Sequence, residues 1–286
     1  MTKAISYIKM NGLGNDFVIV DLRINDIKFT DEQIIAISNR ETGIGCDQFI
    51  TIQASPKGAD IFMRIYNQSG GEVEACGNAT RCIVALLAKE LNKNHIIVAT
   101  GVGFMPSDVD GEIVSVDMGL PRFHWQQIPL SEEFKDTRGI ELQIGPIDNP
   151  ILHTPAVVNV GNPHAVFFVD DDPDLYDLER FGPMLENHPI FPERANISIA
   201  QITAPNVIKL RVWERGVGLT KACGTAACAT AVCAARTNRV EREVEVNLPG
   251  GKLNLDWREG DDHIIMAGGF SFDGEGNIAQ NLLDVN

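Results

Sequence analysis

Ala75-Cys76-Gly77 and Ala222-Cys223-Gly224 are two copies of one tripeptide, 147 positions apart in a chain of 286 residues. The same spacing relates further pairs of segments: Arg64-Ile65-Tyr66-Asn67 to Arg211-Val212-Trp213-Glu214, and Gly14-Asn15 to Gly161-Asn162. This period is far longer than that of a solenoid repeat, so the sequence predicts two copies of one domain. Two similar domains packed about a pseudo-twofold axis would bring the two thiols face to face across a cleft.

Length and charge limit the possible functions. A chain of this length fits two domains, each large enough for its own core. It has 24 Lys and Arg against 39 Asp and Glu, a formal net charge of −15, which argues against nucleic acid and anionic membranes as partners. The first ten residues lack the apolar segment of a signal peptide, and no apolar run approaches the ~18 residues of a membrane span. We therefore expect a cytoplasmic protein whose six cysteines are reduced.

Sequence patterns around the two cysteines predict the same order of elements twice. The β-rich runs 60–67 and 206–214 each lead into a cysteine, and segments 79–91 and 226–236, rich in Ala, Leu and Val, follow as expected buried helices. Short strands separated by turn signals fill much of the remaining chain. We predict an α+β fold of two pseudo-symmetric domains, each a curved antiparallel-rich sheet or barrel around a central helix.

The expected domain boundaries follow from this duplication. Residues 1–121 with 269–286 would form the half that carries Cys76, and residues 122–268 the half that carries Cys223. The polar segment 123–140 is the expected connection between the domains.

The residues after each cysteine suggest a site for an anion. Gly77-Asn78 and Gly224-Thr225 precede the expected helices, and Asn78 or Thr225 could cap them. The N–H groups at a helix N-terminus bind a carboxylate and favour a thiolate. Two such ends would hold one carboxylate with a sulfur on each side of its α-carbon, so that one thiolate removes a proton and the other thiol returns one. No pyridoxal-type lysine site and no metal-ligand cluster is recognisable, so a racemase of this kind would use neither cofactor nor metal.

The other cysteines have simpler explanations. Cys82, Cys228 and Cys233 lie on expected helical faces and are interpreted as core residues, since cysteine is often buried. Cys46 is interpreted as a bystander. No Cys-x-x-Cys spacing is present, which argues against a zinc site and against a thioredoxin-like redox centre.

Ordered motifs extend along essentially the whole chain. They are Lys9-Met10-Asn11-Gly12-Leu13-Gly14-Asn15-Asp16-Phe17, Gly43-Ile44-Gly45-Cys46-Asp47-Gln48, Arg64-Ile65-Tyr66-Asn67, Ala75-Cys76-Gly77-Asn78, Gly161-Asn162-Pro163-His164, Phe191-Pro192-Glu193-Arg194-Ala195-Asn196, Glu214-Arg215-Gly216, Ala222-Cys223-Gly224-Thr225 and Leu248-Pro249-Gly250-Gly251. In these motifs the chain resembles the diaminopimelate epimerases, which are cofactor-independent. It departs from the family pattern at Cys46, Ala79 and Ala226.

The resemblance implies interconversion of LL- and meso-diaminopimelate, on the route to lysine and peptidoglycan, with Cys76 and Cys223 as the acid/base pair. It implies that backbone N–H groups of Gly77, Asn78, Gly224 and Thr225 hold the reacting carboxylate. Glu214, with the Arg215 carbonyl, would take the α-ammonium, and His164 and Glu214 would position or polarise the thiols. The residues implied for the distal amino-acid head and the pocket around it are Asn15, Gln48, Asn67, Asn162, Asn196 and Arg215.

The resemblance also implies a homodimer. Phe272 is a candidate interface residue, at a position where some members have Tyr. Family members close their two domains on the substrate, and the same closure is expected here because a dry site strengthens the basicity of a thiolate.

Several alternatives remain open from the sequence. Proline and hydroxyproline racemases of the same superfamily typically have Gly-His after the first cysteine, whereas Gly77-Asn78 stands here. Isomerase relatives that replace the cysteines are disfavoured by the presence of both. A non-catalytic amino-acid binder or a thiol redox protein would use the same fold without turnover.

Overall fold

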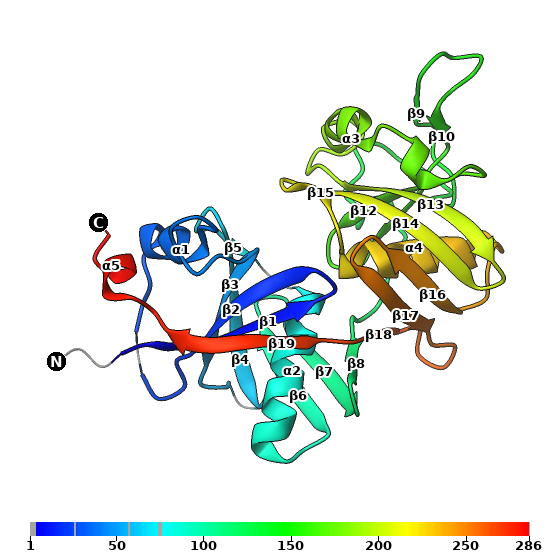
Figure 1. Cartoon of the computed structure of the whole chain (residues 1–286). Coiled ribbons are helices and arrows are strands. Elements are labelled where there is room, and N and C mark those ends of the chain that lie inside the picture. The colour runs from blue at the N-terminus through cyan, green and yellow to red at the C-terminus, as the bar shows by residue number, and fades with distance from the viewer. Residues whose placement is uncertain (1–3, 26, 57, 74–75, 286) are drawn as a thin grey trace. The chain divides into compact units, whose positions relative to one another are not determined.

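The computed structural model describes residues 4–25, 27–56, 58–73 and 76–285 (Figure 1). The chain folds into two compact units. Unit 1 contains the residues up to Val116 together with those from Gly268 onward, and unit 2 contains Asp117–Ala267. Among the described residues, no helix combines the length and apolarity needed to cross a membrane. Whether 1–121 with 269–286 and 122–268 fold as independent halves stays a prediction.

In its described residues, unit 1 is a sheet with one long helix and two short ones (Figure 1). Its elements are β1 (Ser6–Gly12), β2 (Asn15–Asp21), α1 (Asp31–Ser38), β3 (Gln48–Gln53), β4 (Ile61–Asn67), β5 (Glu72–Val73), α2 (Gly77–Leu91), β6 (His95–Thr100), β7 (Gly103–Asp110), β8 (Ile113–Asp117), β19 (Ser271–Asn277) and α5 (Gln280–Leu283). The main strand order is β19-β1-β2-β3-β4-β6-β7-β8, with β5 also paired to β4. Two neighbouring pairs, β2–β3 and β4–β6, are parallel.

Unit 2 has the same organisation. Its elements are β9 (Gln143–Ile144), β10 (Leu152–His153), β11 (Ala156–Asn159), β12 (Pro163–Phe168), the 3₁₀ helix η1 (Pro173–Leu175), α3 (Leu178–Glu186), β13 (Asn196–Ala204), β14 (Val207–Glu214), β15 (Gly218–Thr220), α4 (Gly224–Arg236), β16 (Glu243–Leu248), β17 (Gly251–Trp257) and β18 (Ile264–Gly268). The strand order is β11-β12-β13-β14-β16-β17-β18, and β12–β13 and β14–β16 are the parallel pairs.

The parallel pairs explain where the helices lie. Parallel neighbours require a crossover connection, and in both units the chain crosses over through a helix. Helix α2 connects β4 to β6, and α4 connects β14 to β16. Helix α4 is buried almost all round from Ala226 to Ala234, as expected of a helix enclosed by a sheet. Its small side chains, alanine and cysteine, allow the surrounding strands to approach closely.

The predicted α+β class, mostly strand with few helices, is confirmed. In the described residues, no pairing within a unit joins its two edge strands, β19 to β8 or β11 to β18. Each unit therefore contains an open sheet, not a closed barrel. Helices α2 and α4 begin two residues earlier than expected, at Gly77 and Gly224.

The prediction for the segment 123–140 was wrong. It belongs to unit 2, and Ile128, Leu130 and Ile140 are buried in the same apolar cluster as Phe167 of β12. The segment is polar overall because its turns face solvent, whereas these three side chains anchor it to the core.

Candidate active site

Cys76 and Cys223 occupy the same local position in their units. Each is the residue immediately before the first helical residue, with φ −146° and ψ 111° at Cys76 and φ −135° and ψ 112° at Cys223. Neither helix has a side-chain capping bond at its start, so the expected caps, Asn78 and Thr225, were wrong. The first N–H groups of a helix have no intrahelical acceptor. Both sulfurs therefore lie beside groups suited to bind an anion.

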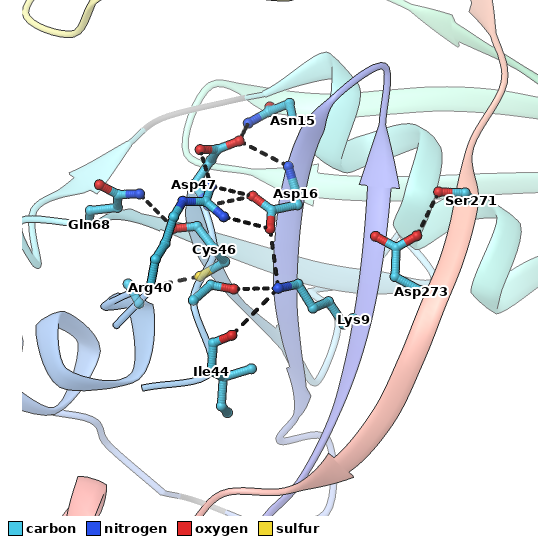
Figure 2. Close-up of polar contacts among 12 residues, drawn as sticks. Lys9, Asn15, Asp16, Arg40, Ile44, Cys46, Asp47, Gln68, Ser271 and Asp273 are labelled. Carbon is cyan, nitrogen blue, oxygen red and sulfur yellow. Dashed lines mark hydrogen bonds and ion pairs between the residues drawn. The ribbon is translucent and has the colours of Figure 1, made fainter. Parts of the chain in front are cut away.

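Asn15 joins Cys76 to an ionic network in unit 1. The Cys76 Sγ donates to Asn15 Oδ1 at 3.8 Å, and Asn15 Nδ2 donates to Asp47 Oδ2 at 3.1 Å. Figure 2 shows Asn15 and Asp47 pointing toward one another from β2 and from the loop before β3. Cys76 itself is half-buried.

The ionic network contains two carboxylates and two cations (Figure 2). Arg40 bridges Asp16 and Asp47, with N–O distances of 2.7 and 2.6 Å, and Lys9 lies 3.3 Å from Asp16. Burial alone would raise the pKa of Asp16, but bonds from Arg40, Asp47 and Lys9 and the Arg40 charge lower it to about 2. Asp16 is therefore ionised at neutral pH, and the network is a fixed set of charges near Asn15.

The remaining predicted residues of unit 1 lie on adjacent strands or at the start of α2. Gln48 and Asn67 are directly opposite in β3 and β4, with Gln48 Nε2 3.4 Å from Asn67 Oδ1. Gln48 Oε1 and Asn78 Oδ1 are buried and have no hydrogen-bond partner within the described part of the chain. Unpaired buried acceptors are costly, and these two could accept from a ligand.

Cys223 has a different environment. It is only 6% exposed, and burial, followed by the negative charge of Glu214, raises the pKa of its thiol well above the ordinary value. A bond with the Thr225 hydroxyl, 3.4 Å away, acts in the opposite direction. The sequence-based expectation that the helix end favours a thiolate is therefore wrong for Cys223 in this state, because burial and a carboxylate outweigh the helix end.

His164 is buried and neutral. Burial, and next the charge of Arg215, lower its pKa to about 3. Its Nε2 lies 2.7 Å from Asn162 Oδ1, so Nε2 carries the proton and donates. Its Nδ1 has no partner among the described residues. A neutral imidazole in this place can orient Asn162 and does not add a positive charge to the site.

Asn196 holds the turn that begins with Arg215, directly after Glu214 at the end of β14. Its Nδ2 donates to Pro163 O at 3.0 Å, and its Oδ1 accepts from the Arg215 backbone N–H at 3.0 Å. The Arg215 side chain donates to Glu193 O at 2.9 Å. Both ends of the Asn196 amide thus bind main chain, and its implied role in reading a substrate stays a prediction.

Sequence reasoning missed three residues of these environments. Asp47 binds Asn15, and the Thr220 hydroxyl donates to Glu214 at 2.5 Å. The buried carboxylate of Glu186 accepts from Trp213 Nε1 at 2.7 Å and from Gly216 N at 2.9 Å. Asp47 stands next to Gln48 in a quoted motif, which was a usable signal. Glu186 lies far from its partners in sequence and gave no such signal.

Two further predictions concern a dimer interface and the binding of a metal ion. Phe272 lies on β19 and is 57% exposed, and its place in a dimer interface stays a prediction. Within the described residues, no group of three or more His, Cys, Asp or Glu side chains is arranged to hold a metal ion.

The chain is similar to known proteins over nearly its whole length. The family model described as diaminopimelate epimerase matches residues 7–124 and 156–272. A diaminopimelate epimerase of Bradyrhizobium sp. (strain ORS 278) is 53% identical over 283 residues, covering 97% of this chain and 96% of that protein. One from Rhizobium meliloti (strain 1021) is 51% identical, covering 97% of this chain and 93% of that protein.

Solved structures share the fold at low sequence identity. A probable proline racemase from Agrobacterium radiobacter has a TM-score of 0.68 and 14% identity, covering 98% of this chain and 94% of that chain. A phenazine biosynthesis protein of the PhzF family from Bacillus anthracis has a TM-score of 0.66 and 19% identity, covering 97% of this chain and 100% of that chain. These structures show the fold alone. The family match and the near-complete relatives together show that this chain belongs to the diaminopimelate epimerase family.

Proposed function

We propose that this chain is an isomerase that epimerises LL-diaminopimelate to meso-diaminopimelate, on the route to lysine and peptidoglycan, without a cofactor. The observation that carries the proposal is the matched position of Cys76 and Cys223, each immediately before the central helix of its unit. A protein of this family with two thiols in equivalent positions has one acid/base group for each face of an α-carbon.

The proton transfers follow from the states of the two sulfurs. One thiolate removes the α-proton, and the other thiol donates a proton to the opposite face, so the centre inverts. Negative charge develops on the α-carboxylate as the proton leaves. N–H groups of Gly77, Asn78, Gly224 and Thr225 at the two helix ends would stabilise that charge, as preorganised donors do in other enzymes.

The high pKa of Cys223 suggests how substrate binding activates the pair. Glu214 raises this pKa through its negative charge. An α-ammonium bound to Glu214 would offset that charge and bring the pKa of Cys223 back toward its ordinary value. Before binding, Cys223 is a thiol and is suited to donate. Once the substrate has bound, Cys223 can donate its proton while Cys76 takes one up. The two sulfurs then have exchanged their proton states, so the reaction can run in both directions.

The distal head of the substrate requires groups for both an ammonium and a carboxylate. We assign this role to the neutral amides and the single guanidinium implied by the family: Asn15, Gln48, Asn67, Asn162, Asn196 and Arg215. A guanidinium can bind a carboxylate with two hydrogen bonds. Amides add donors and acceptors without adding charge. We further propose a cytoplasmic homodimer with Phe272 at its interface.

The test is proton NMR of LL-diaminopimelate in D2O with reduced protein and no added cofactor. The proposal expects meso product with deuterium at one α-carbon, because the distal centre is fixed. Racemisation of proline or hydroxyproline, with diaminopimelate unchanged, would assign the chain to the other substrate class. Absence of exchange with all three amino acids would contradict an epimerase function.

A further inference from the structure

Both ends of the Asn15 amide have a partner in unit 1. Its Nδ2 donates to Asp47 Oδ2 at 3.1 Å, and its Oδ1 accepts from Cys76 Sγ at 3.8 Å. The two partners differ in chemistry: one is a carboxylate, and the other is a thiol expected to exchange protons. The orientation of this amide therefore decides whether the sulfur meets a donor or an acceptor.

Asp47 is held in place by several contacts (Figure 2). Its Oδ2 also accepts from the Asp16 backbone N–H at 3.0 Å, and its Oδ1 accepts from Arg40 Nη2 at 2.6 Å. Its own backbone N–H donates to Asp16 O at 2.9 Å. A side chain fixed in this way can impose an orientation on a neighbouring amide.

A carboxylate accepts hydrogen bonds and does not donate them, whereas an asparagine amide has one end of each kind. The Asn15 end that faces Asp47 must therefore be Nδ2, and the end that faces Cys76 must be Oδ1. A carbonyl oxygen stabilises the S–H form of the sulfur, because a thiolate has no proton to share with it.

We propose that Asp47 is a positioning residue that fixes the Asn15 amide so that its carbonyl oxygen, and not its amino group, faces Cys76. The Cys76 sulfur is thereby held as a hydrogen-bond donor in the unliganded protein. An ammonium group of a bound amino acid can compete for the same oxygen and release the thiol from this bond. This last step rests on the proposed function, whereas the positioning of Asn15 does not.

The pseudo-equivalent asparagine in unit 2 contacts its neighbouring side chain through its other end. Asn162, at the 147-residue spacing from Asn15, accepts through Oδ1 from His164 Nε2 at 2.7 Å. Its carbonyl end is thus occupied by the positioning group and its amino end faces away from it. The two asparagines therefore have different side-chain partners, although they occupy the same position of the repeat.

Charges near Cys76 also affect its proton, so a test must separate orientation from charge. The titratable and charged groups of the surrounding elements are Lys9 on β1, Asp16 on β2, Arg40 and Asp47 before β3, Arg81 and Cys82 on α2, and Asp273 on β19. If the Asp47 charge acted directly on the sulfur, its removal alone would favour the thiolate, as rotation of Asn15 would.

The experiment measures the alkylation of Cys76 by iodoacetamide from pH 6 to 10 in the full-length Cys223→Ala protein, followed by mass spectrometry of the Cys76 peptide. Asp47→Ala is expected to lower the midpoint by about one pH unit, because Asn15 Nδ2 can then turn toward the sulfur and stabilise the thiolate. Asp47→Asn keeps an oxygen that can accept from Asn15 Nδ2 and Asp16 N, so its midpoint is expected to stay near that of the parent.

A double-mutant cycle makes the test decisive. In an Asn15→Ala background, Asp47→Ala is expected to produce almost no further shift, because the group through which Asp47 acts is gone. An undiminished shift in that background would overturn the proposal and assign a direct effect of charge. A shift with Asp47→Asn as large as that with Asp47→Ala would overturn it as well.

A second comparison applies if Asp47→Ala does not fold, as judged by circular dichroism. A charge effect predicts that Asp47→Asn lowers the midpoint and that Arg40→Gln raises it. Fixing of the amide predicts that neither variant changes it. The readout needs no turnover, so this result is separate from success or failure of the proposed epimerase activity.

Discussion

The two cysteines stand at the same position of two units with the same strand order, but their surroundings differ. Cys76 is half-buried and contacts Asn15, beyond which lies the ionic network of Asp16, Arg40 and Asp47. Cys223 is buried and next to a carboxylate, Glu214. The duplicated fold therefore gives each sulfur the same local position, whereas neighbouring side chains, Asn15 on β2 and Glu214 on β14, give the two sulfurs different surroundings. In the proposed two-base reaction one sulfur acts as thiolate and the other as thiol, so these surroundings decide how each sulfur is made ready for proton transfer.

The largest expected effect comes from removing either sulfur. Cys76→Ala and Cys223→Ala should each lower kcat for epimerisation by at least about 1,000-fold, since a positioned acid or base typically contributes 10²–10⁴ in rate. Cys46→Ala is the matched control, because Cys46 is buried and its pKa is raised by burial. Activity that survives in either catalytic variant, measured by the NMR assay, would remove that sulfur from the mechanism.

The charge next to Cys223 gives the second prediction. Glu214→Gln should lower kcat/KM by about 100-fold, because the proposed charge-assisted bond to the α-ammonium would be lost. The same change should lower the alkylation midpoint of Cys223 in a Cys76→Ala background, since Glu214 raises its pKa. Exposed Glu241→Gln is the control. An unchanged midpoint would show that burial alone sets the state of Cys223.

The third prediction concerns the turn after β14, which unit 2 holds with the buried carboxylate of Glu186. Three donors bind this carboxylate: Trp213 Nε1 at one oxygen, and Gly216 N and Arg194 Nη1 at the other. Glu186→Gln leaves the donors at one of the two oxygens without their acceptor. We expect KM to rise about tenfold with a smaller change in kcat, because the proposed substrate-binding residues Glu214 and Arg215 lie at the end of β14 and in this turn. Glu179→Gln, on the exposed face of the same helix, controls for loss of charge. A lower Tm with unchanged KM would restrict Glu186 to stability.

The smallest predicted effect is on the pH dependence of stability. It comes from the neutral His164 of unit 2, whereas unit 1 has a charged network in place of a neutral histidine. His164 has a pKa of about 3 in the folded chain against 6.5 ordinarily, so below pH 6.5 the unfolded state binds a proton that the folded state does not. The stability that the folded chain keeps by holding His164 neutral is therefore complete above pH 6.5 and is lost progressively as the pH falls toward 3. Between pH 7 and pH 5 the free energy of unfolding should fall by about 2 kcal/mol from this cause.

Urea unfolding at both pH values checks this prediction. The His164→Asn variant should lack that part of the loss, whereas His95→Gln, which changes an exposed histidine, should retain it. An equal loss in His164→Asn and the unchanged protein would mean that His164 does not carry the effect.

Much of the fold was predictable because the duplication repeats local patterns. The β-rich runs before each cysteine and the alanine-rich segments after them are visible without tertiary information. The helix starts were missed by two residues because Gly77 and Gly224 weaken a helical pattern, although both begin a helix here. Burial of Ile128, Leu130 and Ile140 was missed because three apolar residues in a polar segment have no regular period.

The sequence was enough to name candidate site residues, whose roles stay predictions, but not to predict their electrostatics. Motif order was enough to name Cys76 and Cys223. The raised pKa of Cys223 depends on how deeply it is buried and on the position of Glu214, which only the packed structure provides. Likewise, the contact between Asp47 and Asn15 joins residues 32 positions apart.

The most direct test of the two-base account is the site of deuterium early in the reaction of LL-diaminopimelate in D2O. Two different sulfurs predict that the first meso product carries deuterium at its inverted centre, while the remaining LL substrate keeps its proton. This follows because the base that removes the proton is not the acid that replaces it. Deuterium entering unreacted LL substrate as fast as it enters the meso product would indicate a single base serving both faces and would contradict the account.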